Sequence, residues 1–221
     1  MHKAIGLAAA VELIPDGASL MIGGFMGVGS PHRLIGELVR QGRRNLTVIA
    51  NDSARPGFAI GKLIDAKLVK HLVASHIGTN PETQRQMIAG ELTVELVPQG
   101  TLAERIRAAG YGLGGVLTPT GVGTTVADGK KEFEIEGRAF LLELPLRADF
   151  ALVAAHRADL SGNLDYSLTA RNFNPIIAMA GATVIAEAAE FVPVGVIPPD
   201  EVITPGVLVD HLVEREKVNG R

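Results

Sequence analysis

The sequence predicts an α/β fold: a single domain with an open, largely parallel sheet flanked by helices. Short apolar runs of strand length alternate with helix-length amphipathic segments through the first half of the chain, as in parallel strands joined by helical crossovers. A hairpin signal further along adds antiparallel strands, so the sheet is expected to be mixed. Neither a repeat of about 20 to 50 residues nor a low-complexity linker interrupts residues 1–221, which are therefore expected to form one domain.

Four strands are expected in the first half of the chain, each followed by a helix. They lie at 18–24, 45–50, 69–75 and 92–97. The helix after the first strand has Ser30 as its expected cap, Pro31 in its first turn and Gly42 just past its end, which are the residue types that begin and end helices.

The helix after the fourth strand has its own boundary signals. Thr101 and Glu104 match the S/T-x-x-E capping box, and Gly110 supplies a C-terminal stop. This pattern predicts that Gln99 and Gly100 stand directly before a helix N-terminus.

The second half of the chain contains a hairpin and two more buried strands. Residues 132–144 alternate polar and apolar side chains around the Glu136–Gly137 pair, a pattern typical of a hairpin. Strands are expected at 149–156 and 182–188, with a short helix at 173–180 between them.

Composition excludes several classes of protein. The formal net charge is −3 and no basic tract is present, so nucleic-acid binding is not expected. The chain has no cysteine, which excludes disulfides, thiolate metal sites and a cysteine nucleophile. No apolar run approaches the roughly 18 residues of a membrane span, no leader pattern is present, and no His, Asp or Glu spacing resembles a metal site. The chain is therefore expected to be cytoplasmic, with no membrane or metal partner.

Ligands of parallel sheets bind at the carboxyl ends of the strands. The strand predictions therefore point to four loops, at residues 24–30, 51–53, 76–80 and 98–100. We expect these loops to line one crevice.

The first of these loops invites comparison with a dinucleotide-binding fingerprint, G-x-G-x-x-G. Counted from Gly27 and Gly29, the third glycine is replaced by His32, where close helix packing requires the absence of a side chain. Two interpretations remain besides a dinucleotide site: a tight turn whose glycines supply positive φ, and a row of N–H groups at a helix start that stabilises an anion or a developing oxyanion.

The stretch DGASLMIGGFMGVGSP, residues 16–31, resembles the glycine-rich signature of family I coenzyme A transferase alpha subunits. The similarity continues in order through TVIANDS, SHIGTNPETQRQMIAGEL, ELVPQGTLAERIRAAG, LTPTGVGT, LRADFALVAAHRAD, GNL and ARNFNP, which covers nearly the whole chain. The resemblance is strongest to acetate or short-chain fatty acid:acetoacetyl-CoA transferases, with 3-oxoacid CoA-transferases as near relatives. It implies a CoA-transferase-like fold and CoA-transferase activity.

The resemblance also implies a mechanism and a partner. In the family a glutamate attacks the acyl-CoA thioester and then carries CoA as a glutamyl thioester in a ping-pong sequence. This glutamate stands in a Ser-Glu-Asn type motif, which this chain lacks, so it is expected from a beta subunit in an α2β2 assembly. Glutamates that we interpret as solvated are Glu91, Glu95, Glu104, Glu143 and Glu187. The substrates implied are an acyl-CoA and a short carboxylic acid, with no permanently bound cofactor; a chain without its partner can form a homo-oligomer.

Site residues follow from the family blocks. Gln99 matches the glutamine that stabilises the thioester oxyanion. The residues that match the CoA-contacting loop are Gly24, Phe25, Met26, Gly27, Val28, Gly29 and Ser30; Phe25 has a core position as its alternative.

Other candidates depend on their place at strand ends. Asn51 and Asp52 are candidates for the acyl pocket, with a local Asx-turn as the alternative. His76 is a candidate for acid–base catalysis, but a structural role in which its ring is hydrogen-bonded is favoured. Asn172 and Asn174 flank a helix start, where a structural role is expected.

Two functions from other classes remain open at this point. One is a nucleotide- or sugar-phosphate-binding α/β domain that uses the same loop for phosphate. The other is a non-catalytic structural paralogue that only oligomerises.

Overall fold

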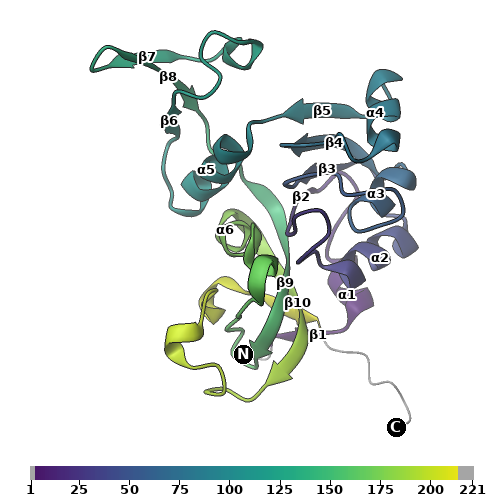
Figure 1. Ribbon diagram of the computed structural model, residues 1–221. Helices are drawn as coiled ribbons and strands as arrows, with labels where there is room; N and C mark the ends of the chain where they lie inside the picture. The colour runs from purple at the N-terminus through teal and green to yellow at the C-terminus, as the bar shows by residue number, and fades with distance from the viewer. Residues whose placement is uncertain (1–2, 214–221) are drawn as a thin grey trace.

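The computed structural model describes residues 3–213 and is built around one large sheet (Figure 1). This sheet has eight strands in the order β1-β11-β10-β9-β2-β3-β4-β5, and every neighbouring pair is parallel. A second, three-stranded sheet has the order β6-β8-β7 and is antiparallel. The expected α/β fold is confirmed, but the expected mixing of strand directions within one sheet is wrong, because the hairpin pairs with β6 instead.

The strands of the large sheet are β1 (Ala4–Ile5), β2 (Ser19–Ile22), β3 (Leu46–Ile49), β4 (Val69–Ala74), β5 (Thr93–Leu96), β9 (Ala148–Asp159), β10 (Gly181–Val192) and β11 (His211–Val213). The small sheet contains β6 (Val116–Thr118), β7 (Glu132–Ile135) and β8 (Arg138–Glu143). The helices are α1 (Leu7–Glu12), α2 (His32–Gln41), α3 (Gly61–Asp65), α4 (Pro81–Ile88), α5 (Gln99–Gly110) and α6 (Asn174–Ala180). The six strands predicted at 18–24, 45–50, 69–75, 92–97, 149–156 and 182–188 all lie in the large sheet, and the helix predicted between β9 and β10 is present.

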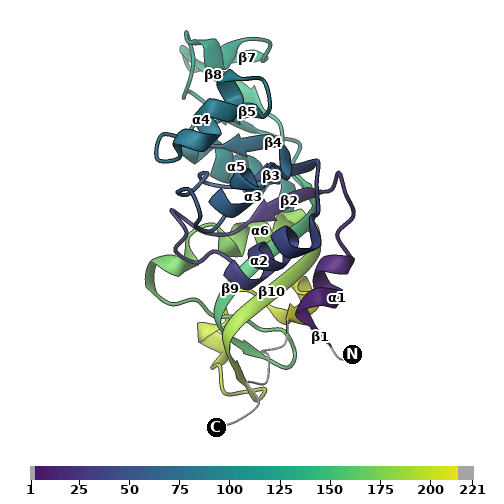
Figure 2. The ribbon, with the colours of Figure 1, turned by 90° about the vertical axis from the view of Figure 1, so that its right-hand side faces the viewer.

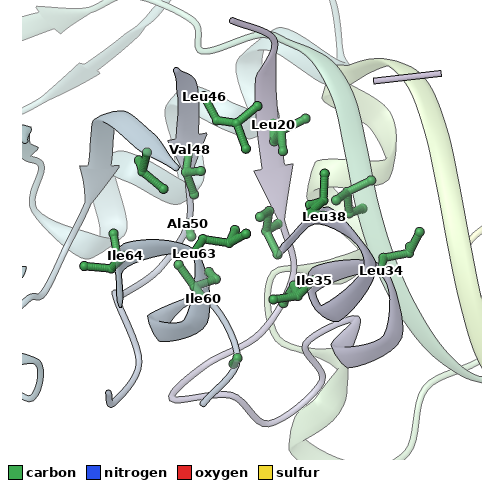
Figure 3. Close-up of a cluster of buried hydrophobic side chains, with 14 of the residues drawn as sticks. Leu20, Leu34, Ile35, Leu38, Leu46, Val48, Ala50, Ile60, Leu63 and Ile64 are labelled. Carbon is green, nitrogen blue, oxygen red and sulfur yellow. The ribbon is translucent and has the colours of Figure 1, made fainter. Parts of the chain in front are cut away.

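Helices cover both faces of the large sheet. In Figures 1 and 2, α1 to α4 lie on one face and α5 and α6 on the other. Figure 3 shows Leu34, Ile35 and Leu38 of α2 turned toward the sheet, beside Leu20 of β2. Each of these side chains is fully buried, and such burial stabilises the fold by about 1.5–3 kcal/mol per side chain. Because their helical spacing places these three residues on one face of α2, the helix packs against the strand that precedes it.

The hairpin forms where its turn residues predict. Glu136 and Gly137 have φ values of 51° and 74°, as a two-residue type I′ turn requires, and Ile135 pairs with Arg138 on the opposite strand. The small sheet that results extends away from the large one (Figure 1).

Helix ends are less well predicted than helices. Gly42 ends α2 with φ 68°, and α5 ends at Gly110, as expected. The prediction that Thr101 caps α5 is wrong, because the helix starts at Gln99 with Pro98 as its N-cap residue. Thr101 therefore lies inside the first turn. Gln99 therefore lies within the helix, at its first position.

No helix in residues 3–213 combines the length and apolar character that a bilayer crossing requires. Over the same residues, no three His, Asp or Glu side chains gather as metal ligands would. The single-domain organisation of residues 1–221 stays a prediction, and residues 1–2 and 214–221 lie outside the described part of the chain.

Candidate functional site

The strand order places the glycine-rich loop at a change of direction in the sheet. From β2 the chain adds β3, β4 and β5 on one side, whereas β9 is followed by β10 and β11 on the other. β2 and β9 are neighbours, so the loops that follow them leave toward opposite sides. Ligands of open α/β sheets bind at such switch points, and the loop after β2 is the glycine-rich one.

The tip of this loop is a tight turn. Phe25 and Val28 exchange backbone hydrogen bonds of 3.0 and 2.9 Å, and the two residues between them, Met26 and Gly27, have φ values of 49° and 86°. This is a type I′ turn. It leaves the side chains of Phe25 and Val28 46% and 50% exposed, so Phe25 is not a core residue.

Two asparagines at the start of α6, Asn172 just before it and Asn174 at its first position, hold the loop. The Asn172 side chain accepts from the Gly24 N–H at 3.2 Å and donates to the Val28 carbonyl at 2.9 Å. The Asn174 side chain donates to the Gly29 carbonyl at 2.9 Å and accepts from the Ala154 N–H at 3.0 Å. These asparagines have the structural role that was expected, but they stabilise the glycine loop rather than the start of α6.

Internal hydrogen bonds occupy several N–H groups of the glycine loop. The Gly24 N–H donates to Asn172, the Met26 N–H to Asp52 at 2.8 Å, and the Ser30 N–H to the Gly27 carbonyl at 3.3 Å. A phosphate cradle requires several such groups aimed at the ligand. Several N–H groups of this loop therefore hold the loop itself rather than point toward a ligand.

The N-terminus of α2 is also occupied, by Glu187 of β10. Its carboxylate accepts from the N–H groups of Arg33 at 3.1 Å and Leu34 at 2.9 Å. Burial raises the pKa of Glu187, and the two backbone bonds oppose that rise. The expected capping by Ser30 is wrong: Ser30 is buried beneath Gly24, and the helix is capped by a carboxylate distant in the sequence. The expectation that Glu187 is solvated is wrong for the same reason.

Glu187→Gln is expected to make the free energy of unfolding depend less on pH. Burial holds the pKa of folded Glu187 above its ordinary 4.5, so between these two values the folded state binds more protons than the unfolded state. The wild-type protein therefore loses stability as pH rises through this window, and the variant lacks that loss. Urea unfolding at a series of pH values measures it, with exposed Glu190→Gln on the same strand as the control. A constant difference between wild type and Glu187→Gln across the series contradicts the prediction.

Polar side chains from three strand ends meet beside the loop. The Gln99 side-chain amide donates from Nε2 to Asn51 Oδ1 at 2.7 Å. Asn51 in turn donates from Nδ2 to Asp52 Oδ2 at 2.7 Å and accepts from the Ser75 hydroxyl at 3.1 Å. The structure thus brings Gln99, Asn51, Asp52 and the glycine loop together, as their positions after strands predicted. Asp52 also forms the Asx-turn, since its Oδ1 accepts from the Ala54 N–H at 2.7 Å.

Two other residues differ from their expected surroundings. His76 lies exposed at this edge, and its ring makes no hydrogen bond to another described residue, so the hydrogen-bonded role favoured for it is absent from residues 3–213. Glu143 is buried rather than solvated, with Lys130 and Arg105 beside its carboxylate.

A cavity of about 470 Å³ opens beside the loop tip. Its lining residues are Phe25, Val28, Thr169 and Asn172. The exposed apolar side chains of the tip therefore face a space that a ligand can enter.

The sequence matches the model of one protein family, described as coenzyme A transferase, over residues 5–215. The chain belongs to the coenzyme A transferase family. It is 53% identical over 211 residues to the acetate CoA-transferase subunit alpha of Escherichia coli K12, with 96% of each chain covered. It is 51% identical over 199 residues to the acetoacetyl-CoA:acetate/butyrate CoA transferase alpha subunit of Clostridium acetobutylicum, covering 90% of this chain and 91% of that one. The family predicted from the sequence blocks is confirmed.

A solved structure shares the fold. The acyl-CoA transferase of Escherichia coli O157:H7, in a thioester complex with CoA, superposes with a TM-score of 0.86 at 24% identity. The superposition covers 97% of this chain and 47% of that one, so this coenzyme A transferase chain spans about half the length of that protein.

Proposed function

We propose that this chain is the alpha subunit of a heteromeric CoA-transferase. The enzyme moves CoA between a short-chain acyl-CoA or 3-oxoacyl-CoA and a free carboxylic acid. The observation that carries the proposal is the Gln99 amide, which lies exposed beside the glycine loop and is oriented by Asn51 at 2.7 Å. The relatives named for acetate, butyrate and acetoacetyl-CoA support the class of substrate.

Gln99 is suited to stabilise an oxyanion. Because Gln99 is the first residue of α5, the positive end of the helix dipole lies beside it. The N-cap residue, Pro98, makes no side-chain cap bond at this helix end. When a carboxylate attacks a thioester, negative charge develops on the thioester oxygen, and an amide N–H stabilises it without pairing with the attacking carboxylate.

The nucleophile in this proposal comes from a beta subunit. Its glutamate carboxylate adds to the thioester carbonyl, CoA leaves as thiolate, and the acyl anhydride that remains is opened by the thiolate at the glutamyl carbonyl. This yields a glutamyl-CoA thioester and the free acid, and the second acid reverses the steps. In the chain itself the carboxylates of Glu187 and Glu143 are held by α2 and by Lys130. The assembly that we propose is α2β2.

The glycine loop contributes to CoA binding through its tip. The exposed side chains of Phe25 and Val28, and the cavity that they line together with Thr169, suit the uncharged pantetheine arm of CoA. The internal bonds of the loop argue against phosphate contacts there, and thus against the nucleotide- or sugar-phosphate-binding alternative.

The test is acyl exchange by the assembled subunits. The chain is co-expressed with the product of a neighbouring reading frame that carries a Ser-Glu-Asn motif. The complex is expected to transfer CoA from acetoacetyl-CoA to acetate, and a panel of other short acids is then assayed as acceptors. Each subunit alone is the control and is expected to be inactive. The isolated chain is expected to bind adenine dinucleotides negligibly. An assembled complex that exchanges CoA with none of the acids contradicts the proposal and favours a non-catalytic paralogue.

A further inference from the structure

We propose that Asp52 is a positioning residue that fixes both the tip of the glycine loop and the amide of Gln99. This inference rests on the role proposed for Gln99. Asp52 is 4% exposed, and both of its carboxylate oxygens accept hydrogen bonds within the protein. Oδ1 accepts from the Ala54 N–H at 2.7 Å, and Oδ2 accepts from the Met26 N–H at 2.8 Å and from Asn51 Nδ2 at 2.7 Å. Asp52 therefore acts on the site through its neighbours rather than as a wall of an acyl pocket.

The first neighbour is Asn51, whose amide has one orientation that satisfies its partners. Because Asp52 only accepts, the Asn51 NH₂ group must face it, which turns Oδ1 toward Gln99 Nε2 at 2.7 Å. The reversed amide would set oxygen against the carboxylate and NH₂ against NH₂. Asn51 is 2% exposed, so water does not relieve such a mismatch.

The orientation passes on to Gln99. One hydrogen of its Nε2 is donated to Asn51, and because the amide group is planar, the direction of the second hydrogen is then set. The side chain is exposed, so that second N–H remains for a substrate oxygen. A donor held in place before the reaction needs no reorganisation when charge develops.

The second neighbour is Met26, at the tip of the glycine loop. Met26 has φ 49°, a conformation that L residues other than glycine adopt at a cost. The bond from its N–H to Asp52 helps to hold this conformation, as does the 3.5 Å contact of the Thr79 hydroxyl with Met26 Sδ. One buried carboxylate thus sets the loop tip and the oxyanion donor relative to each other.

A double-mutant cycle on the assembled enzyme tests this coupling. In Asp52→Asn one carboxylate oxygen becomes NH₂, which stands either against the Ala54 N–H or, in place of Oδ2, against both the Met26 N–H and the Asn51 NH₂. Either arrangement disturbs the position of residue 52, and the second also turns Asn51 so that Gln99 loses its acceptor. We expect kcat/KM for acetoacetyl-CoA to fall by up to about 100-fold, as a small displacement of a catalytic group does. In the Gln99→Ala background the same substitution is expected to cost at least about tenfold less, because coupled residues are not additive.

Asp159→Asn is a matched control. Asp159 is 1% exposed and accepts from two backbone N–H groups, of Ser161 at 2.9 Å and Asn163 at 3.0 Å, and from Asn163 Nδ2 at 2.8 Å. It therefore accepts from the same kinds of donor as Asp52, two backbone N–H groups and one asparagine amide, but from no residue of the glycine loop and from no partner of Gln99. Both variants are expected to lower the melting temperature, whereas only Asp52→Asn is expected to lower the turnover of the folded enzyme.

The outcomes separate this inference from the function on which it rests. Near-wild-type turnover of Gln99→Ala would contradict the role proposed for Gln99, on which this inference rests. A low turnover of Gln99→Ala, combined with equal fold losses for Asp52→Asn in the two backgrounds, would overturn the positioning role alone. If Asp52→Asn does not fold, Asn51→Ala replaces it in the cycle. That variant breaks the link between Asp52 and Gln99, and its loss is likewise expected to shrink when Gln99 is absent; equal losses overturn the inference.

Discussion

Gln99→Ala is expected to lower kcat of the assembled enzyme by about 100-fold or more while the subunits still assemble. The substitution removes the side-chain amide and leaves the backbone of α5 in place, because alanine favours a helix at least as well as glutamine. Since Gln99 is exposed and makes its side-chain bond to Asn51 alone among the described residues, little folding stability depends on it.

The expected kinetic pattern distinguishes stabilisation of charge from substrate binding. An oxyanion exists only near the transition state, so losing its donor lowers kcat and kcat/KM together and leaves KM nearly unchanged. Steady-state exchange kinetics measure both constants, and size-exclusion chromatography measures assembly. A rise in KM with unchanged kcat would instead assign Gln99 to ground-state binding.

Two variants control this experiment. Gln84→Ala removes another glutamine at the same edge, whose amide donates to the carbonyls of Ile77 and Gly78, and is expected to leave turnover within about twofold of wild type. Gln99→Glu keeps the size of the side chain but replaces NH₂ by a carboxylate oxygen, which repels both Asn51 Oδ1 and the developing oxyanion. Turnover at least as low as that of Gln99→Ala is expected.

Local pattern predicted the strands and helices of this chain well, and long-range contacts account for most of the differences. β2, β3 and β4 are short, largely apolar runs with mostly buried side chains, as expected of parallel strands covered on both faces. β5 is also parallel, but it lies at the sheet edge and its side chains are exposed or half-buried. The cap of α2 was not predictable in this way, because Glu187 reaches its N-terminus from 153 residues away. The direction of the strands in the small sheet was predicted, but their partner β6 was not, since the pairing of β6 with β8 is set by the tertiary fold.

The candidate site likewise has a part that local pattern predicted and a part that depends on long-range contacts. Gln99, Asn51 and the glycine loop were placed together because the carboxyl ends of parallel strands share one edge. That Asn172 and Asn174 would hold the loop was missed, since their contacts join segments more than 140 residues apart. The one signal in the sequence was a pair of asparagines that flank a helix start, where a structural role such as a cap is the usual interpretation.

Gly29→Ala is expected to destabilise the fold by about 2–4 kcal/mol and to lower turnover of the protein that still folds. Gly29 has φ +74°, and a Cβ there would lie 2.5 Å from the carbonyl oxygen and 2.9 Å from the Cα of Ala170. Both atoms belong to the backbone that leads into Asn172 and Asn174, so no side-chain rotation relieves the collision. The loop must move away from the segment that holds it. Urea unfolding and acyl exchange measure the two effects.

Variants at two other glycines distinguish the cost of backbone strain from the cost of a steric collision. Gly57 has φ +72° but open space around the position of a Cβ, and Gly36 lies inside α2 with neither strain nor a neighbour. Gly57→Ala is therefore expected to show only the cost of the left-handed conformation, about 1–2 kcal/mol. Gly36→Ala is expected to stabilise α2 by up to about 1 kcal/mol. Equal losses in Gly29→Ala and Gly57→Ala would mean that the loop is free to shift against Ala170, and its hold by the two asparagines would then not determine its position.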